Sequence, residues 1–475
     1  MDASTPPSPS AALNPTVLWV AAGSAVLFIF CAFSAFLLMT QTEPLSERLA
    51  REAQAIEGIA WPRPSHVTPA PPGTFAQALT PLLPALNALP ELAPSLRASP
   101  HLDAESEGES EAYSDAYDAL EEQCQAVSRG EAPLSAAPGA CLEVLHKSRE
   151  LLHRVLVATR VEVGGLPASM GGLARPADLL DPTRMNSLKR VVELAALETR
   201  VLGAEGRPEE AVDTCLDALA LSRELSLGGG MYGRALSASC HEFLFQPCAQ
   251  ALDVAPRERQ RLALEQLARL RQGFPPLSAV LREESVYEQL SAYGDLVSPP
   301  AFDLLPPQSQ ELVTPHDSWM FAYARSSRHP RLRPYEWRRN AALFDAMVAA
   351  ADLPPEQRRE AFLAIDENTG LLPGEHRWRA KDYHDQAETF AAQPLQALAL
   401  AALVEVDLAR AEQGAWPEVL SPELEAAFWL DPESDFEAWL VPRDARLGVE
   451  ELRLTAGTAP SAPPGPAYAG GGGLR

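Results

Sequence analysis

Residues 191–225 read VVELAALETRVLGAEGRPEEAVDTCLDALALSREL, and their spacing predicts two helices that fold back on each other. An apolar stripe at i, i+3, i+4 and i+7 runs along the second half, formed by Val212, Cys215, Leu216 and Leu219. The first helix stops between Gly203 and Gly206. Pro208 then stands in a first helical turn, where its missing N–H costs nothing. The sequence therefore predicts a helical hairpin at 185–226.

The helical pattern continues on both sides of this hairpin. Ala and Leu are abundant and aromatic residues make up only 7% of the 475 residues, a composition that favours helix over sheet. We expect further helices at 140–163, 182–203, 208–226, 231–253, 256–272, 276–293, 335–352, 355–366 and 383–413, with Pro394 kinking or splitting the last. The predicted fold class is mainly α, with a helical domain at 113–413.

A separate apolar stretch lies near the N-terminus. Residues 16–39 form a run of 24 residues, none of which is charged. A helix of that length spans roughly 36 Å, enough to cross a hydrocarbon core of about 30 Å. We predict a single transmembrane helix at 16–40, preceded by a disordered segment at 1–15. That segment has four prolines and no Lys or Arg. Because a secretory signal normally opens with basic residues, an uncleaved anchor is expected, with a cleaved signal as the alternative.

The orientation of this anchor is weakly encoded. Arg48 and Arg51 follow it and no basic residue precedes it, so the positive-inside rule favours a cytoplasmic domain, although long domains often cross regardless of these counts. The proline-rich segment that follows and the family resemblance given below favour the opposite side. We expect a single-pass membrane protein with most of its chain extracytoplasmic.

Residues 41–112 are predicted to form a stalk or linker. A short polar helix at 43–57 leads into WPRPSHVTPAPPG at 61–73, whose prolines favour an extended spacer. Nine acidic residues and no basic ones follow between 103 and 122. At the other end, residues 414–456 are predicted to be irregular, with short strands near 437–442 and 451–455. The Pro- and Gly-rich tail at 457–475 is expected to be disordered.

The hairpin resembles a tetratricopeptide-type repeat. The matching positions are Gly206, Glu210, Ala211, Ala218 and Leu219. No second copy is clear at the 34-residue period of such repeats, so the hairpin is described as TPR-like. The wider region 185–293 resembles a set of uncharacterised bacterial membrane-anchored helical proteins. Residues 411–420, AEQGAWPEVL, together with Asp431-Pro432 are similar to the ends of type II secretion pseudopilins.

One helix carries a candidate metal site. Its polar residues repeat as Glu-x-x-His, a spacing that di-iron bundles use because i and i+3 side chains converge on one ion. The four side chains fall within an arc of roughly 80°, and they are Glu143, His146, Glu150 and His153. Functional sites of this kind take a second pair from another helix, whereas all four residues here face away from the apolar stripe. A solvated polar face is the preferred interpretation, and no cofactor or resident metal is expected.

A second candidate site is the basic stretch YARSSRHPRLRPYEWRR at 323–339. Arginine forks and aromatic faces together suit phosphates, anionic lipid headgroups or an acidic protein partner. The candidate anion- or partner-binding residues are Arg325, Arg328, Arg331, Arg333, Trp337, Arg338 and Arg339. The alternative is that these arginines pair with the protein's own acidic surface.

Charge and cysteine content limit the function classes. A formal net charge of -25 argues against nucleic-acid binding, which needs a basic face. The six cysteines show no CxxC spacing, and a disulfide between helices, such as Cys215 with Cys240, stays open. The favoured function is a non-catalytic scaffold or protein-interaction module of a bacterial cell envelope, with the concave side of residues 185–293 binding a protein partner. A metal-assisted enzyme and a secretion or pilus-like assembly component are the alternatives, and the oligomeric state is not indicated.

Overall fold

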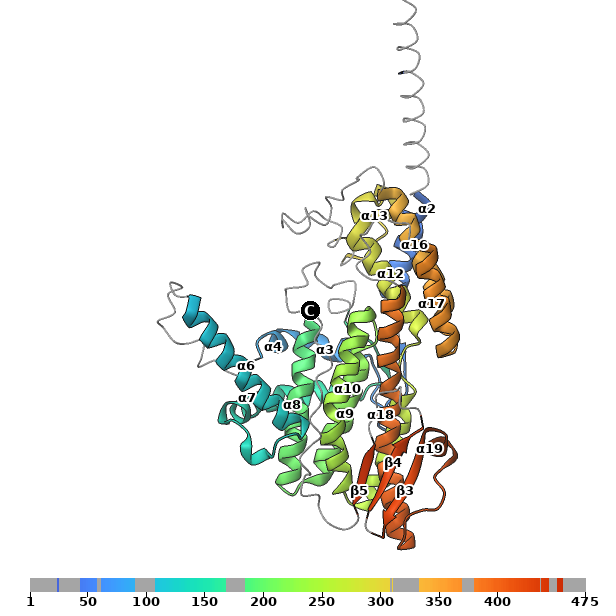
Figure 1. Ribbon diagram of the computed structural model, residues 1–475. Helices are drawn as coiled ribbons and strands as arrows, with labels where there is room; N and C mark the ends of the chain where they lie inside the picture. The colour runs from blue at the N-terminus through green and yellow to red at the C-terminus, as the bar shows by residue number, and fades with distance from the viewer. Residues whose placement is uncertain are drawn as a thin grey trace, which may run out of the picture.

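The structure is a computed structural model that describes Ser24 and residues 43–57, 61–89, 107–167, 184–307, 310, 333–369, 380–435, 437–443 and 451–455. The described chain is mainly α-helical (Figure 1), which confirms the mainly α part of the predicted fold class and leaves the N-terminal membrane helix a prediction. In chain order its helices are α2 (Glu43–Glu57), α3 (Phe75–Leu79), α4 (Leu83–Asn87), α6 (Glu107–Arg129), α7 (Gly139–Ala158), α8 (Arg184–Ala204), α9 (Pro208–Leu225), α10 (Gly230–Asp253), α11 (Arg257–Arg271), α12 (Leu277–Tyr293), α13 (Pro299–Phe302), α16 (Arg333–Ala351), α17 (Pro355–Thr369), α18 (Ala380–Gln413) and α19 (Pro422–Ala427).

The predicted hairpin is confirmed as α8 and α9, which pack against each other and against α10. Pro208 is the first residue of α9, as the sequence predicts. The largest apolar core joins this trio to α6, α7, α11 and part of α18. Because α9 lies at the centre of that core, nearly all of its side chains are buried, including those outside the Val212–Leu219 stripe.

A second part of the molecule, at the upper end in Figure 1, is formed by α12, α13 and α16 together with α2. Its apolar core includes Leu49, Ala50 and Ala53 of α2, which contact the region of Val286 and Trp337. The predicted helix at 43–57 is therefore present. It is part of the folded body, because its apolar face is buried against α12 and α13.

Residues 61–89, within the segment 41–112 that the sequence assigns to a stalk or linker, also belong to the folded body. Helices α3 and α4 and the 3-10 turn between them (Thr80–Leu82) bury four large apolar side chains in the main core, namely Phe75, Leu79, Leu82 and Leu86. The prolines do limit these helices to short pieces, since α3 and α4 have five residues each. The short pieces nevertheless bury enough apolar surface to pack against the helical domain.

The C-terminal part combines the long helix α18 with a small sheet. Helix α18 contains Pro394 without being divided into two helices. The three-stranded antiparallel sheet has the order β3-β4-β5, with β3 (Phe428–Ser434), β4 (Glu437–Pro442) and β5 (Leu452–Thr455). Strands β4 and β5 match the predicted strands, whereas β3 was not predicted. The sheet packs its apolar face, with Phe428 and Leu440 buried, against α18.

The predicted transmembrane helix at 16–40 lies outside the described residues, Ser24 excepted, as do the segments 1–15 and 457–475. Among the helices that the structure describes, α18 has the length and composition to cross a membrane. However, 62% of its apolar window is buried inside the protein, and it contacts α10, α11 and α17. This degree of burial is typical of a helix in the core of a folded domain.

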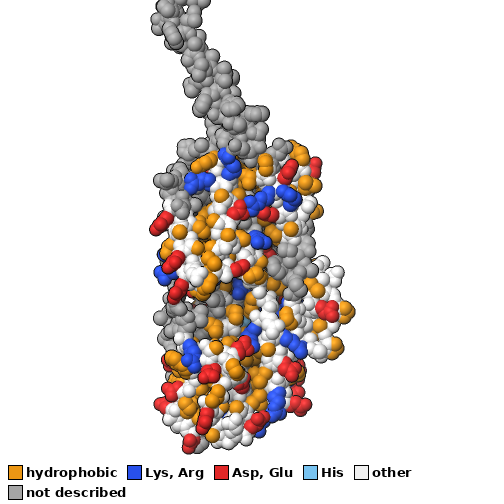
Figure 2. Space-filling view, turned by 90° about the vertical axis from the view of Figure 1, so that its right-hand side faces the viewer, with side chains coloured by type: hydrophobic (Ala, Val, Ile, Leu, Met, Phe, Trp, Pro, Cys, Tyr) orange, Lys and Arg blue, Asp and Glu red, His pale blue; other side chains and the backbone are white. Residues whose placement is uncertain are grey.

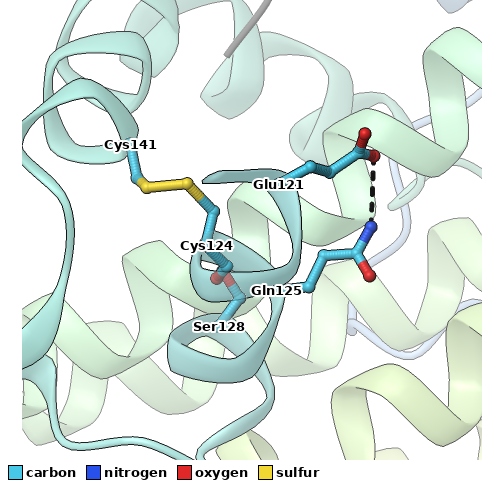
Figure 3. The surroundings of a disulfide bond; sticks show 5 residues. All are labelled: Glu121, Cys124, Gln125, Ser128 and Cys141. Carbon is cyan, nitrogen blue, oxygen red and sulfur yellow. Dashed lines mark hydrogen bonds between the residues drawn. A yellow bond between two sulfur atoms is a disulfide. The ribbon is translucent and has the colours of Figure 1, made fainter. Parts of the chain in front are cut away.

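Two disulfide bonds connect neighbouring helices. Cys124 of α6 is bonded to Cys141 of α7 (Figure 3), where the Ser128 hydroxyl also donates to the Cys124 carbonyl at 2.8 Å. Cys215 of α9 is bonded to Cys248 of α10, and Cys240 is free and buried. The suggested pairing of Cys215 with Cys240 is therefore wrong.

Candidate interaction site

An irregular loop leaves and rejoins the short strand β2 (Val163–Gly164) at nearly the same point. On one side β1 (Trp61–Pro62) pairs with β2, placing Pro62 opposite Val163. On the other side Thr74 forms a bridge to the same Val163. Residues 63–73 thus form a compact loop with adjacent ends, an Ω-loop, and this name is used for them below.

The Ω-loop enters the protein through two side chains. Of the twelve residues from Arg63 to Thr74, all of which the structure describes, Arg63 and His66 are the two buried ones. The others, prolines included, are half-buried or exposed. A segment that is largely exposed and has two buried charged or polar side chains resembles a bound peptide with two anchor residues.

Arg63 forms an ion pair with Glu224 of α9, and both side chains are fully buried. The Glu224 carboxylate also accepts a hydrogen bond of 2.9 Å from the Gly165 backbone N–H. Arg63 Nη2 donates to the Thr159 carbonyl at 2.9 Å. The pair is therefore held by groups from the Ω-loop, from the end of α7 and from α9, which offset part of the cost of burying two charges.

The second anchor, His66, contacts Asp217, also on α9. The two atoms His66 Nε2 and Asp217 Oδ1 are 2.7 Å apart. Arg160 holds the same carboxylate in a bidentate contact, with Nη2 at 2.6 Å from Oδ2 and Nε at 3.0 Å from Oδ1. Burial lowers the pKa of His66 below its usual range, against the opposing effect of Asp217. The hydrogen bond to Asp217 raises the pKa of Arg160.

Arg223 completes the charged cluster beneath the Ω-loop. Its side chain is fully buried and Nη1 donates weakly to the carbonyls of Arg269 at 3.3 Å and Leu270 at 3.4 Å. Burial lowers the pKa of Arg223 to about 10. The cluster therefore contains three guanidinium groups, those of Arg63, Arg160 and Arg223, and two carboxylates, those of Asp217 and Glu224.

A separate pair of glutamates on α12 binds the N-terminus of α10. Glu283 and Glu284 of α12 accept hydrogen bonds of 2.9 and 3.0 Å from the N–H groups of Gly230 and Met231. These are first-turn donors of α10, which have no partner within the helix, and the carboxylates also face the positive end of its dipole. Burial raises the pKa of Glu283 to about 8. This contact has the character of a structural cap.

The candidate metal residues lie where the sequence places them, on the outer face of α7. Glu143, His146, Glu150 and His153 are all exposed. Glu143 is paired with Lys147 at 2.6 Å, which lowers its pKa. Within the described ranges, no three His, Cys, Asp or Glu side chains are grouped so as to hold a metal ion.

The candidate anion-binding residues are divided between two environments. Arg325, Arg328 and Arg331 lie outside the described residues. Trp337 is fully buried, donates to Gln289 at 2.9 Å and stacks on Tyr293. Arg333 is also buried and donates to the Ala292 carbonyl at 2.6 Å.

Trp337 and Arg333 are therefore core residues, since the apolar side of α16 packs against α12. Arg338 and Arg339 remain near the surface, close to the Tyr335 ring. On the face shown in Figure 2, Lys and Arg side chains lie among acidic and apolar ones. The described part of the predicted basic stretch thus contributes two arginines to the surface.

Little of α9, the second helix of the hairpin, is exposed. From Ala211 to Leu225 every residue of α9 except Asp213 is buried. The charged cluster was missed because its members are far apart in sequence, although one signal was available. Leu221 and Leu225 lie on the opposite side of α9 from the Val212–Leu219 stripe, a pattern that indicates a helix buried on more than one side, so Asp217 and Glu224 within it require buried partners.

Comparison with known proteins yields no relative: no family model, no curated protein and no solved structure matches this chain. The interpretation of the site therefore depends on its geometry and chemistry.

Proposed function

We propose that this protein is a non-catalytic scaffold of a bacterial cell envelope, anchored in the membrane by residues 16–39, whose TPR-like helices bind a protein partner. The observation that carries the proposal is the way in which the helices hold the Ω-loop. Two carboxylates of α9 recognise two specific side chains, Arg63 and His66, of a segment that is otherwise exposed. This is the chemistry by which helical arrays recognise an irregular or extended protein segment.

Two further features support the proposal, one for the location and one for the partner. Disulfides persist in oxidising compartments and are rare in the cytosol. The Cys124–Cys141 and Cys215–Cys248 bonds therefore favour an extracytoplasmic domain. The net charge of -25 gives the domain a solvated acidic surface, which suits a basic protein partner better than a nucleic acid.

Site-specific photo-crosslinking of the full chain in cells would test the proposal. One variant carries a photoreactive amino acid at Pro72, an exposed Ω-loop position, and the matched control carries it at Glu360, an exposed position on α17. A partner that binds at the Ω-loop should form one reproducible adduct with the Pro72 variant and none with the Glu360 variant. Identical adduct patterns from both positions, or no adduct from either, would contradict the proposal.

A topology reporter tests the proposed side of the membrane separately. A fusion at the C-terminus to a reporter that is active only outside the cytoplasm should be active, and the same fusion to a reporter active only in the cytoplasm should be silent. The reverse result would place the domain in the cytoplasm while leaving partner binding to be judged by crosslinking.

A further inference from the structure

We propose that the Ω-loop is a displaceable intramolecular ligand, and that the carboxylates of Asp217 and Glu224 beneath it bind a basic, proline-containing segment of a protein partner by exchange. This inference rests on the proposed scaffold function and specifies both the binding surface and the chemistry of the partner. In the absence of the partner the loop keeps the site closed.

The connections of the Ω-loop allow it to lift without disturbing the rest of the fold. Its two ends meet at Val163, through the Pro62 pairing on one side and the Thr74 bridge on the other. Beyond these ends, α2 is held in the core of α12 and α16, and α3 is held in the main core. Because each flank has its own packing, the loop can leave α9 while both neighbouring helices stay in place.

The contacts that hold the loop down are mostly polar. The Pro71 and Gly73 carbonyls accept hydrogen bonds of 3.2 and 3.3 Å from the N–H groups of Glu162 and Val163, close to the end of the loop. Arg63 and His66 bind α9, and the Ser65 hydroxyl donates to the Arg160 carbonyl at 2.6 Å. Arg269 also donates to the Thr68 hydroxyl on the exposed side. A segment held mainly by polar contacts, with little apolar burial of its own, opens at a lower free energy than the apolar core beneath it.

The site left by the loop is expected to prefer an arginine side chain of the partner. After lifting, Asp217 would retain Arg160, whereas Glu224 would lose its ion-pair partner Arg63 and keep the Gly165 N–H and the longer-range attraction of Arg223. A buried carboxylate in that state needs a cation, and the planar fork of an arginine replaces Arg63 most closely. Gly164 leaves room for that fork, since a Cβ there would lie 2.6 Å from Arg63 Nε.

The incoming segment is also expected to contain proline. Five prolines occur in residues 62–72, and proline lowers the conformational entropy that a segment loses on binding. The partner chemistry is thus an arginine, a histidine or second basic group three residues later, and flanking prolines.

A binding experiment in trans tests this exchange. The probe is a fluorescent peptide of residues 61–74, WPRPSHVTPAPPGT, added to the full chain carrying Arg63→Ala and His66→Ala. Fluorescence anisotropy should show saturable binding to this double variant. Binding to the wild-type chain should be weaker by about tenfold or more, because its own loop occupies the site.

Two controls make the result specific. A peptide with alanine in place of its arginine and histidine should bind at least about tenfold more weakly than the original peptide. Adding Glu224→Gln to the double variant should likewise weaken binding of the original peptide. Absence of saturable binding to a double variant with a native circular dichroism spectrum, or equal binding after Glu224→Gln, would overturn the inference.

Hydrogen exchange of the wild-type chain decides the matter if the double variant does not fold. The inference requires the amides of the Ω-loop and of Gly165, which is bonded to Glu224, to exchange faster than those of α9. If the amides of the Ω-loop and of Gly165 exchange as slowly as those of α9, the loop opens only when the whole protein unfolds. That result would overturn the inference. A specific Pro72 crosslink in cells would still support the scaffold function in that case.

Discussion

At Gly164 the backbone passes so close to the buried ion pair that it leaves no space for a side chain. A Cβ at this position would lie 2.6 Å from Arg63 Nε and 2.7 Å from Glu224 Oε2. Both groups are fully buried and bonded, so neither can move away without weakening the pair. Glycine is therefore required at position 164 because the backbone there packs directly against charged side chains.

We predict that Gly164→Ala lowers the free energy of unfolding by about 2–3 kcal/mol, the usual cost of inserting an atom into a packed interior. Chemical denaturation of the full chain measures this change. Gly203→Ala is the matched control, because nothing lies within 4 Å of the added Cβ. Within helix α8 that substitution should be neutral or stabilising by up to about 1 kcal/mol. Equal stability of the Gly164 variant and the wild type would show that the pair adjusts freely.

Glu283 gives the stability of the protein a defined pH dependence. Its pKa is about 8 in the folded protein and has a reference value of 4.5. Because the folded state binds this proton more tightly, the stabilising contribution is complete below pH 4.5 and is lost as the pH rises through 8. Burial lowers the pKa values of His66 and His241, so their contributions are lost on acidification below about 6.5.

The range from about pH 7 to 9 therefore isolates Glu283 from the histidines. Glu283→Gln keeps an oxygen to accept the Gly230 N–H bond and removes the titration. We expect the wild type to lose about 1 kcal/mol more stability than the variant across this range. Thermal unfolding at several pH values measures the difference. Parallel pH profiles for the two proteins would contradict the assignment.

At the scale of elements, the Cys215–Cys248 bond links α9, which carries both carboxylates of the site, to α10. It closes a loop with a sequence separation of 33, for which loop-closure entropy corresponds to about 3–4 kcal/mol. The bond therefore restrains the helix on which the Ω-loop is anchored.

Replacing both cysteines by alanine should destabilise the protein by about 3–4 kcal/mol. Denaturant titration under non-reducing conditions measures the change. The free and buried Cys240 is the control, and Cys240→Ala should cost about 1 kcal/mol or less, as expected for a small volume change. If the double variant unfolds at the wild-type midpoint, the bond does not contribute to stability.

At the scale of the whole molecule, the chain combines a proposed membrane anchor with a body that includes α2. Leu49, Ala50 and Ala53 are buried in the part formed with α12, α13 and α16. The body therefore includes α2, which begins at Glu43, close in sequence to the proposed anchor at 16–39.

Two truncations test the separate roles of the anchor and of α2. A chain starting at Glu43 should leave the membrane fraction and keep the helical circular dichroism of the body. A chain starting at Trp61 should also lose α2, which exposes the apolar residues around Val286 and lowers the melting temperature by several degrees. Retention of the first truncation in the membrane fraction would contradict the role of residues 16–39. Equal melting temperatures would contradict the role of α2.

The helices of the body follow from local periodicity. The predicted helices at 208–226 and 276–293 agree closely with α9 and α12, because apolar spacing and an N-terminal proline act within a few turns of chain. The small sheet was predicted less completely. Strand β3 contains Asp431 and Pro432, which are unfavourable in a strand, and it forms because it pairs with β4.

The candidate site depends on contacts between distant residues, and only the tertiary structure reveals them. Arg63 and Glu224 are more than 150 positions apart, and nothing in the local pattern around either one indicates the other. The prolines at 62–72 correctly indicate a helix-free segment, yet its position depends on two buried anchors rather than on its own conformation. Local spacing thus determines which residues become helix, whereas the burial of charge determines which segments meet, since a buried charge requires a partner from elsewhere in the chain.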